Sequence, residues 1–133
     1  MKTMKYLGID YGRKRMGLAV SDEEGRIAFP RMQFTTYNFL HTVKTLSDIV
    51  KKDLVEKIIV GLPVTFGGKE SAQTVEARAF GEKLKKAIQL PIEFENEMLT
   101  TKMAIRGGIA KSKVDASSAA IILQSYLDRE NRK

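Results

Sequence analysis

The sequence contains no cysteine, which excludes disulfide bonds, thiolate metal sites and cysteine nucleophiles. It has a single histidine, His41, in a predicted helix with no second metal-type ligand nearby, so neither a zinc site nor a Ser-His pair is indicated. No apolar run approaches the roughly 18 residues of a membrane span, and the opening MKTMKY lacks the apolar stretch of a secretory signal. These absences favour a cytoplasmic enzyme or binding protein.

Length and charge narrow the class further. The chain has 133 residues, about the size of one domain, so we expect a single domain over residues 1–133. Its 23 Lys and Arg residues against 16 Asp and Glu residues give a formal charge of +7. Such a basic domain favours a polyanionic partner, with nucleic acid ahead of a membrane surface. The alternative is an ordinary basic surface that is merely solvated.

Hydrophobic periodicity predicts alternating strands and helices. Two strands joined by a tight turn at 11–14 come first, a third follows, and helices then alternate with strands, which implies one mixed sheet with helices on its faces. A glycine-rich loop is expected at 65–71 and a flexible loop at 107–113. The predicted strands are 5–10, 15–21, one within 26–35, 55–63 and 91–97, and the predicted helices are 38–52, 71–88, 101–106 and 115–129.

Three carboxylates stand at the ends of these predicted elements. Asp10 ends the first strand, Glu97 ends the last strand, and Asp115 opens the last helix. In an open α/β sheet, strand ends are where ligands bind, and three converging carboxylates favour a hard cation such as Mg²⁺. Two such ions about 4 Å apart, holding an attacking water and a leaving oxygen, would give nuclease chemistry.

Each carboxylate also has a purely structural explanation. Asp10 precedes Gly12 and could shape a turn. Glu97 could be a solvated carboxylate at a strand end, and Asp115 stands where a helix N-cap belongs. The spacing therefore suggests a metal-binding trio without establishing it.

Four segments carry a resemblance to a known family: GIDYGRKRMGLAVSD (8–22), IVGLPVTFGGKES (59–71), LTT (99–101) and DASSAAIILQSYLD (115–128). Together they resemble the YqgF family of ribonuclease H-like proteins, described as candidate Holliday junction resolvases and as nucleases that mature the 5′ end of pre-16S ribosomal RNA. The resemblance runs nearly from end to end. It implies an α/β fold of ribonuclease H type, with a five-stranded mixed sheet, an antiparallel second strand and helices on both faces. It also implies a metal-dependent phosphodiester hydrolase that uses Mg²⁺ or Mn²⁺, with Asp10, Glu97 and Asp115 as ligands.

The sequence departs from the family pattern next to one of these carboxylates. The family usually has Asp-Glu-Arg before LTT, whereas this chain has Asn96, Glu97 and Met98. Loss of the arginine removes a phosphate contact or charge partner, and Asn in place of Asp alters the charge around the site. A fourth carboxylate is common in this class, but Asp22 is at the far end of the second strand, a poor position for one.

Basic residues flank the candidate carboxylates. With the family resemblance they are expected to contact the phosphates of nucleic acid, and without it they would be expected to be solvated. Gly107 and Gly108 would leave the loop beside three of them mobile enough to act as a clamp over substrate. The predicted nucleic-acid contacts are Arg13, Lys14, Arg15, Lys69, Arg78, Arg106, Lys111 and Lys113.

Three classes of function follow from these observations: a nuclease acting on RNA or on branched DNA, an ATPase, and a non-catalytic RNA-binding factor. The favoured one is an endonuclease for the 5′ end of pre-16S rRNA, acting as a monomer or weak homodimer. Branched DNA ranks second, because resolving a junction requires a symmetric dimer. An ATPase like actin or the sugar kinases would need two such domains, and a catalytically decayed RNA-binding factor of ribosome assembly would explain Asn96 and Met98.

Overall fold

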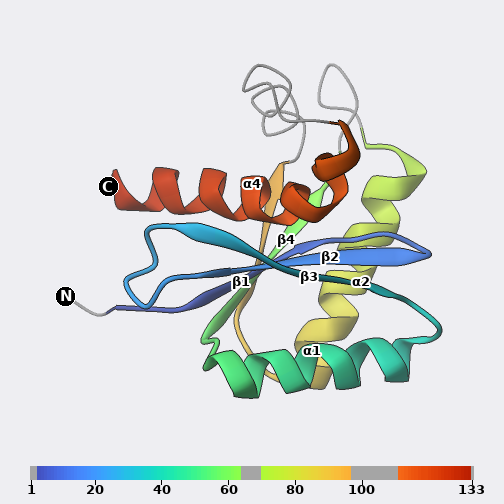
Figure 1. The fold of residues 1–133 in the computed structure, drawn as a ribbon. Coiled ribbons are helices and arrows are strands. Elements are labelled where there is room, and N and C mark those ends of the chain that lie inside the picture. Colours follow the sequence, from blue (N-terminus) through green and yellow to red (C-terminus); the bar gives the residue numbers. More distant parts are fainter. Residues whose placement is uncertain (1–2, 64–69, 97–110, 133) are drawn as a thin grey trace.

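The computed structural model describes residues 3–63, 70–96 and 111–132, and over residues 111–117 it describes the backbone alone. Figure 1 shows a twisted central sheet with helices on both sides. The described elements are β1 (Tyr6–Asp10), β2 (Arg15–Ser21), β3 (Ala28–Thr35), α1 (Phe39–Asp53), β4 (Lys57–Leu62), α2 (Ala72–Ile88), β5 (Ile92–Asn96) and α4 (Lys111–Asn131).

The five strands form one mixed sheet in the order β3-β2-β1-β4-β5. β2 runs antiparallel to both β1 and β3, whereas β1, β4 and β5 are parallel. The predicted five-stranded mixed sheet with an antiparallel second strand is therefore confirmed. Because β1, β4 and β5 point the same way, their carboxyl ends lie at one edge, and Asp10 is the last residue of β1 at that edge.

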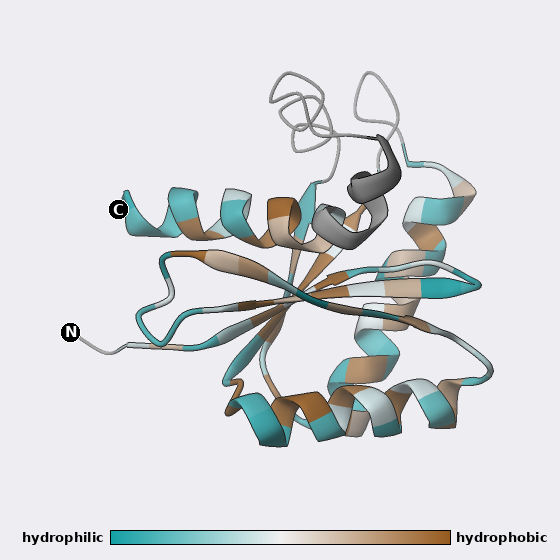
Figure 2. Cartoon of the chain, viewed as in Figure 1, coloured by the Kyte–Doolittle hydropathy of each residue, from teal (hydrophilic) through white to brown (hydrophobic). Residues whose placement is uncertain are grey.

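Alternate residues of β1 face two separate cores. Leu7 and Ile9 pack with residues of α1 and α2, whereas Gly8 lies against α4 on the opposite face. Figure 2 shows the central parts of the strands coloured mainly hydrophobic and the β1–β2 turn hydrophilic. Asp10, two residues after Gly8, shares the α4 face of the sheet.

α4 runs antiparallel to β1. The side-chain amide of Asn131 donates to the Gly25 carbonyl at 3.0 Å, and the Tyr126 ring lies 5.7 Å from the Tyr6 ring, so the end of the helix covers the start of the strand. Figure 1 accordingly shows both ends of the chain on the same side of the molecule. A Cβ on Gly8 would lie only 2.8 Å from the Leu123 Cβ, so glycine at this position permits the close approach of helix and sheet.

The first two helices begin and end within a residue of their predicted bounds, because side chains cap them locally. The Asn38 side chain accepts from the His41 amide at 2.8 Å, and Ser71 and Thr74 form a capping box at the start of α2. Leu54 and Gln89 end the helices in the left-handed conformation.

The last helix begins earlier than predicted. α4 begins at Lys111, so Asp115 is its fifth residue and not its N-cap, and Lys111 and Lys113 belong to the helix instead of a flexible loop. The segment KSKV contains no glycine or proline to stop a helix, and Ser and Asp are cap signals only when a helix begins there. The predicted helix 101–106 lies outside the described residues. None of the described helices has the length and apolar character needed to cross a bilayer.

Candidate nuclease site

Asp10 stands between two clefts at the carboxyl edge of the sheet. The larger cleft, of about 560 Å³, runs between the β1–β2 turn and the start of α2, where Gln73 and Glu76 line it. The smaller cleft, of about 270 Å³, lies over β2 and β3, where Arg15 and Gln33 line it. One half-buried carboxylate thus lines both clefts, at the edge where α/β proteins bind ligands.

The backbone of α4 brings Asp115 toward this carboxylate. Ala119 and Leu123 lie against Gly8, and the helix runs antiparallel to β1. Asp115 precedes Ala119 by one helical turn, about 6 Å of rise, and Asp10 follows Gly8 by two strand residues, a step of about 6.6 Å. Asp10 and Asp115 therefore both lie beyond the contact between Gly8 and Ala119, toward the carboxyl end of β1.

The third predicted carboxylate, Glu97, lies outside the described residues. It directly follows Asn96, the exposed last residue of β5. Among the described residues there is no group of three His, Cys, Asp or Glu side chains that could hold a metal ion. The convergence of Asp10, Glu97 and Asp115 therefore stays a prediction.

The turn between β1 and β2 carries the basic residues nearest Asp10. The guanidinium of Arg13 donates to both carboxylate oxygens of Glu76 at 2.8 and 2.9 Å, joining the turn to α2. This hydrogen bond lowers the pKa of Glu76 and raises that of Arg13. Lys14 and Arg15 are exposed, and within the described part of the chain neither has an ion-pair partner.

The remaining predicted phosphate contacts divide into two groups. Arg78 on α2 forms an ion pair with Glu70, so its charge is already partly compensated. Lys69 and Arg106 lie outside the described residues, and the side chains of Lys111 and Lys113 are not described. Lys14 and Arg15 are thus the described cations best placed to receive a phosphate beside Asp10.

Gly12 and Asp22 have the structural surroundings expected of turn residues. A Cβ on Gly12 would overlap the carbonyl oxygen of Arg15, so only glycine fits the tight turn. The Asp22 carboxylate accepts from the amides of Arg26 and Ile27, and these hydrogen bonds lower its pKa. Asp22 follows the end of β2 that pairs with the start of β1, so it is remote from Asp10.

The structure adds a buried carboxylate that the sequence analysis missed. Glu95 on β5 is only 4% exposed, and its two oxygens meet Arg129 at 2.7 Å and the Ser125 hydroxyl at 2.9 Å, both on α4. Strand alternation in IEFEN was the available signal, because it puts Glu95 on the sheet face opposite Phe94. Glu76, Gln73 and Gln33 had no comparable signal, since their place in the clefts depends on packing between distant segments.

Replacing Glu95 by Gln is expected to lower the free energy of unfolding by about 2 kcal/mol, because Arg129 and Ser125 would lose a charged, buried acceptor. Urea unfolding followed by circular dichroism measures the change. The matched control is Glu93→Gln on the same strand, where the ion pair with Lys57 involves a half-exposed carboxylate and we expect less than about 1 kcal/mol. Equal losses in both variants would contradict the structural role assigned to Glu95.

The sheet order, the antiparallel β2 and the acid at the end of β1 define a ribonuclease H-like fold. Among solved structures, RuvC of T. thermophilus in complex with a Holliday junction substrate matches 96% of this chain and 96% of its own with a TM-score of 0.62, at 14% sequence identity. At that identity the match shows the fold alone.

Sequence comparisons identify the family. The model of the RuvX family, described as Holliday junction resolvase, matches residues 4–129, and the chain belongs to this family. A relative from Caldanaerobacter subterraneus named "Putative pre-16S rRNA nuclease" is 39% identical, over 96% of this chain and 98% of its own length. A relative of the same name from Nitratidesulfovibrio vulgaris is 37% identical over 93% of each chain. The YqgF resemblance drawn from the motifs is thereby confirmed.

Proposed function

We propose that this protein is a divalent-metal-dependent endonuclease that cuts structured RNA, and that its reaction is maturation of the 5′ end of pre-16S rRNA. The observation that carries the proposal is Asp10, placed at the carboxyl edge of the sheet between two clefts and beside the exposed Lys14 and Arg15. The names of its full-length relatives support the choice of RNA.

The three proposed ligands are all carboxylates, and these fit Mg²⁺ or Mn²⁺, which prefer carboxylate and water ligands. In this proposal Asp10, Glu97 and Asp115 hold two such ions. The bound ions would polarise the phosphoryl oxygens and lower the pKa of a water molecule. Glu97 is included because the family resemblance assigns it a metal-ligand role.

The protein's own side chains hold the substrate backbone in this proposal. Arg15 lines the smaller cleft, Arg13 lines the larger cleft and Lys14 lines both, so these side chains bind phosphates on both sides of Asp10. Arg13 exchanges its ion pair with Glu76 for a phosphate when RNA enters. The scissile bond would then lie over Asp10, with its neighbours fixed on both sides.

Cleavage of branched DNA is the second candidate, because the RuvX family is described as Holliday junction resolvase. Resolving a junction needs two active sites related by symmetry, and therefore a dimer. Sedimentation velocity with and without a four-way DNA junction tests this requirement. A monomer under both conditions would remove this candidate and leave the RNA reaction.

The main experiment compares three labelled substrates: the 5′ end of precursor 16S rRNA, an unstructured single-stranded RNA and a four-way DNA junction. Each is incubated with Mg²⁺, Mn²⁺ or EDTA. We expect a defined product from the precursor with either metal and none with EDTA. Metal-independent RNA binding without cutting would instead indicate a non-catalytic assembly factor, and ATP turnover in a parallel assay would indicate an ATPase.

Salt dependence tests the basic residues of the turn. Lys14→Ala and Arg15→Ala are each expected to reduce the slope of log affinity against log salt concentration by about 1, because each removes a phosphate contact. Arg13→Ala is expected to reduce the slope less, since Glu76 already compensates its charge. Fluorescence polarisation of a labelled RNA over a NaCl series measures the slopes. Wild-type slopes in the Lys14 and Arg15 variants would mean that these side chains are simply solvated.

A further inference from the structure

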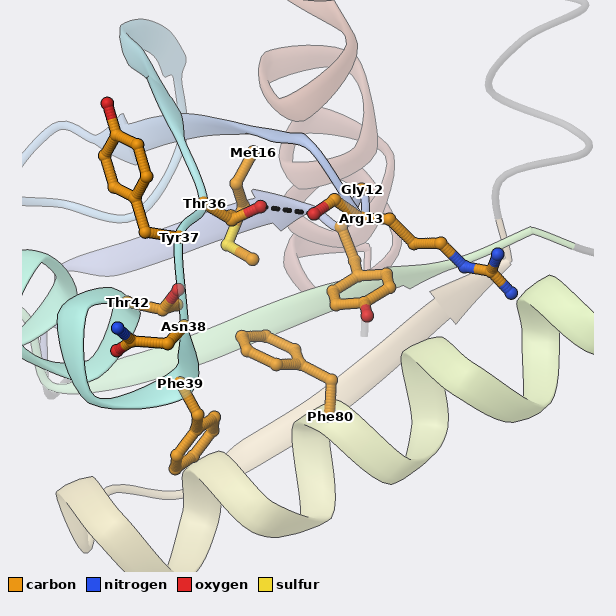
Figure 3. Close-up of a pocket in the computed structure, with 10 residues that line it drawn as sticks. Gly12, Arg13, Met16, Thr36, Tyr37, Asn38, Phe39, Thr42 and Phe80 are labelled. Carbon is orange, nitrogen blue, oxygen red and sulfur yellow. Dashed lines mark hydrogen bonds between the residues drawn. The ribbon is translucent and has the colours of Figure 1, made fainter.

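A third hollow, an aromatic cavity, lies on the α1 and α2 side of the β1–β2 turn. It has a volume of about 200 Å³ and is lined by Tyr11, Met16, Tyr37, Asn38, Phe39 and Phe80, among others. Figure 3 shows Phe80 and Met16 reaching into the space between the turn and the start of α1, with Tyr37 at the rim and its ring directed outward. No step of the proposed cleavage uses this cavity.

Hydrogen bonds and aromatic contacts hold the walls of the cavity in place. The Thr36 amide donates to the Lys14 carbonyl at 2.8 Å, and the Thr36 hydroxyl donates to the Arg13 carbonyl, which ties the segment before α1 to the turn (Figure 3). The Tyr11 and Phe80 rings pack 4.8 Å apart, and Phe39 meets Phe80 edge to face at 6.3 Å. The cavity is therefore preformed, and a ligand would not have to order it.

The chemistry of the lining suits a flat, partly polar ring. Aromatic faces stack on nucleobases with little regard to sequence. Asn38 uses its side-chain oxygen to cap α1, and its amide nitrogen has no partner among the described residues, so it can donate to a ring carbonyl or ring nitrogen. At about 200 Å³ the cavity is smaller than the roughly 300–1,000 Å³ of drug-sized ligand sites, which matches one base and not a whole nucleotide.

The position of the cavity links it to the candidate nuclease site. Tyr11, Gly12 and Arg13 line both this cavity and the larger cleft that Asp10 borders. A strand whose phosphates follow the turn would therefore pass the mouth of the cavity. An unpaired base next to the cut can leave the stack at modest free-energy cost and enter it.

We propose that this cavity binds one unpaired nucleobase of the RNA substrate and so sets which phosphodiester bond lies over Asp10. The inference rests on the proposed nuclease function, because it needs a nucleic-acid strand along the turn. In this proposal Phe80 and Asn38 are positioning residues, because they bind the base and the bound base fixes the place of the scissile bond.

An abasic scan tests the inference by binding, without requiring catalysis. The probe is a fluorescein-labelled single-stranded RNA of about 12 nucleotides, in EDTA, with an abasic residue at each position in turn. We expect one position at which loss of the base weakens wild-type binding about tenfold. In Phe80→Leu, which keeps an apolar side chain but loses the flat face, that penalty should fall below about twofold.

One further variant makes the test independent of Phe80, and another serves as its control. Asn38→Asp keeps a helix-capping oxygen but loses the amide donor, so we expect the same loss of the abasic penalty. Phe34→Leu is the matched control, because Phe34 packs on the same core outside the cavity lining and its variant should keep the wild-type pattern.

The outcomes separate this inference from the nuclease proposal. Metal-dependent cleavage together with a flat abasic scan, or with a penalty that persists in Phe80→Leu and Asn38→Asp, overturns the base site and leaves the nuclease intact. A Phe34→Leu variant that also loses the penalty overturns the assignment to this cavity. Failure of the wild type to bind any RNA overturns both proposals.

Discussion

Replacing Asp10 by Asn is expected to lower the rate of metal-dependent cleavage on the order of 10³-fold. Asp10 is the only one of the three proposed metal-binding carboxylates whose side chain is described, and it borders both clefts. Asn has nearly the same shape but no charge, so the fold should be retained while the metal loses a ligand. Metal stabilisation of a phosphoryl transition state amounts to several kcal/mol, and about 1.4 kcal/mol corresponds to a factor of ten.

The measurement is single-turnover cleavage of precursor 16S ends in Mg²⁺ and in Mn²⁺. RNA affinity in EDTA should stay at the wild-type value or rise, because the variant removes a negative charge near the phosphates. Asp22→Asn is the control, since Asp22 lies at the far end of β2 and holds only its own turn. An Asp10→Asn rate within about threefold of wild type, less than 1 kcal/mol, would show that the metal site is elsewhere.

Replacing Gly8 by Val is expected to destabilise the protein by about 3 kcal/mol, as overpacking of a tight core does. A Cβ at this position would lie 2.8 Å from the Leu123 Cβ and 3.0 Å from the Ala119 carbonyl oxygen. Both atoms belong to α4 close to its backbone, so the clash cannot be relieved by a side-chain rotation alone. The helix must move away from β1, and the buried contacts of Leu123 with the sheet are lost.

Thermal unfolding should show the loss as a fall of about 10 °C in Tm. Cleavage should fall as well below the new Tm, because the displaced helix carries Asp115. Ala87→Val, which also adds side-chain bulk but on the exposed face of α2, should change the free energy of unfolding by about 0.5 kcal/mol at most. A Gly8→Val protein as stable as the wild type would contradict the packing of α4 described above.

Local signals explain which elements could be predicted from the sequence. The bounds of α1 and α2 were predicted closely because Asn38 and Ser71 cap the helices through bonds to amides three residues away. The start of α4 was predicted wrongly because Asp115 resembles an N-cap, whereas the helix already begins at Lys111, and no glycine or proline between 111 and 114 stops it. The ion pair of Arg13 with Glu76 was not predicted, because the two residues are 63 positions apart.

The sequence by itself determined the order of strands and helices, the charge of the β1–β2 turn, the position of Asp10 at a strand end and the family. These depend on side-chain periodicity and short motifs, which act over a few residues. Only the tertiary structure decided that Arg13 forms an ion pair with Glu76, whereas Lys14 and Arg15 have no ion-pair partner among the described residues. It also decided that Glu95 is buried against α4 and that an aromatic cavity adjoins the turn. Those features arise where distant segments pack together, and packing depends on the shapes of both partners at once.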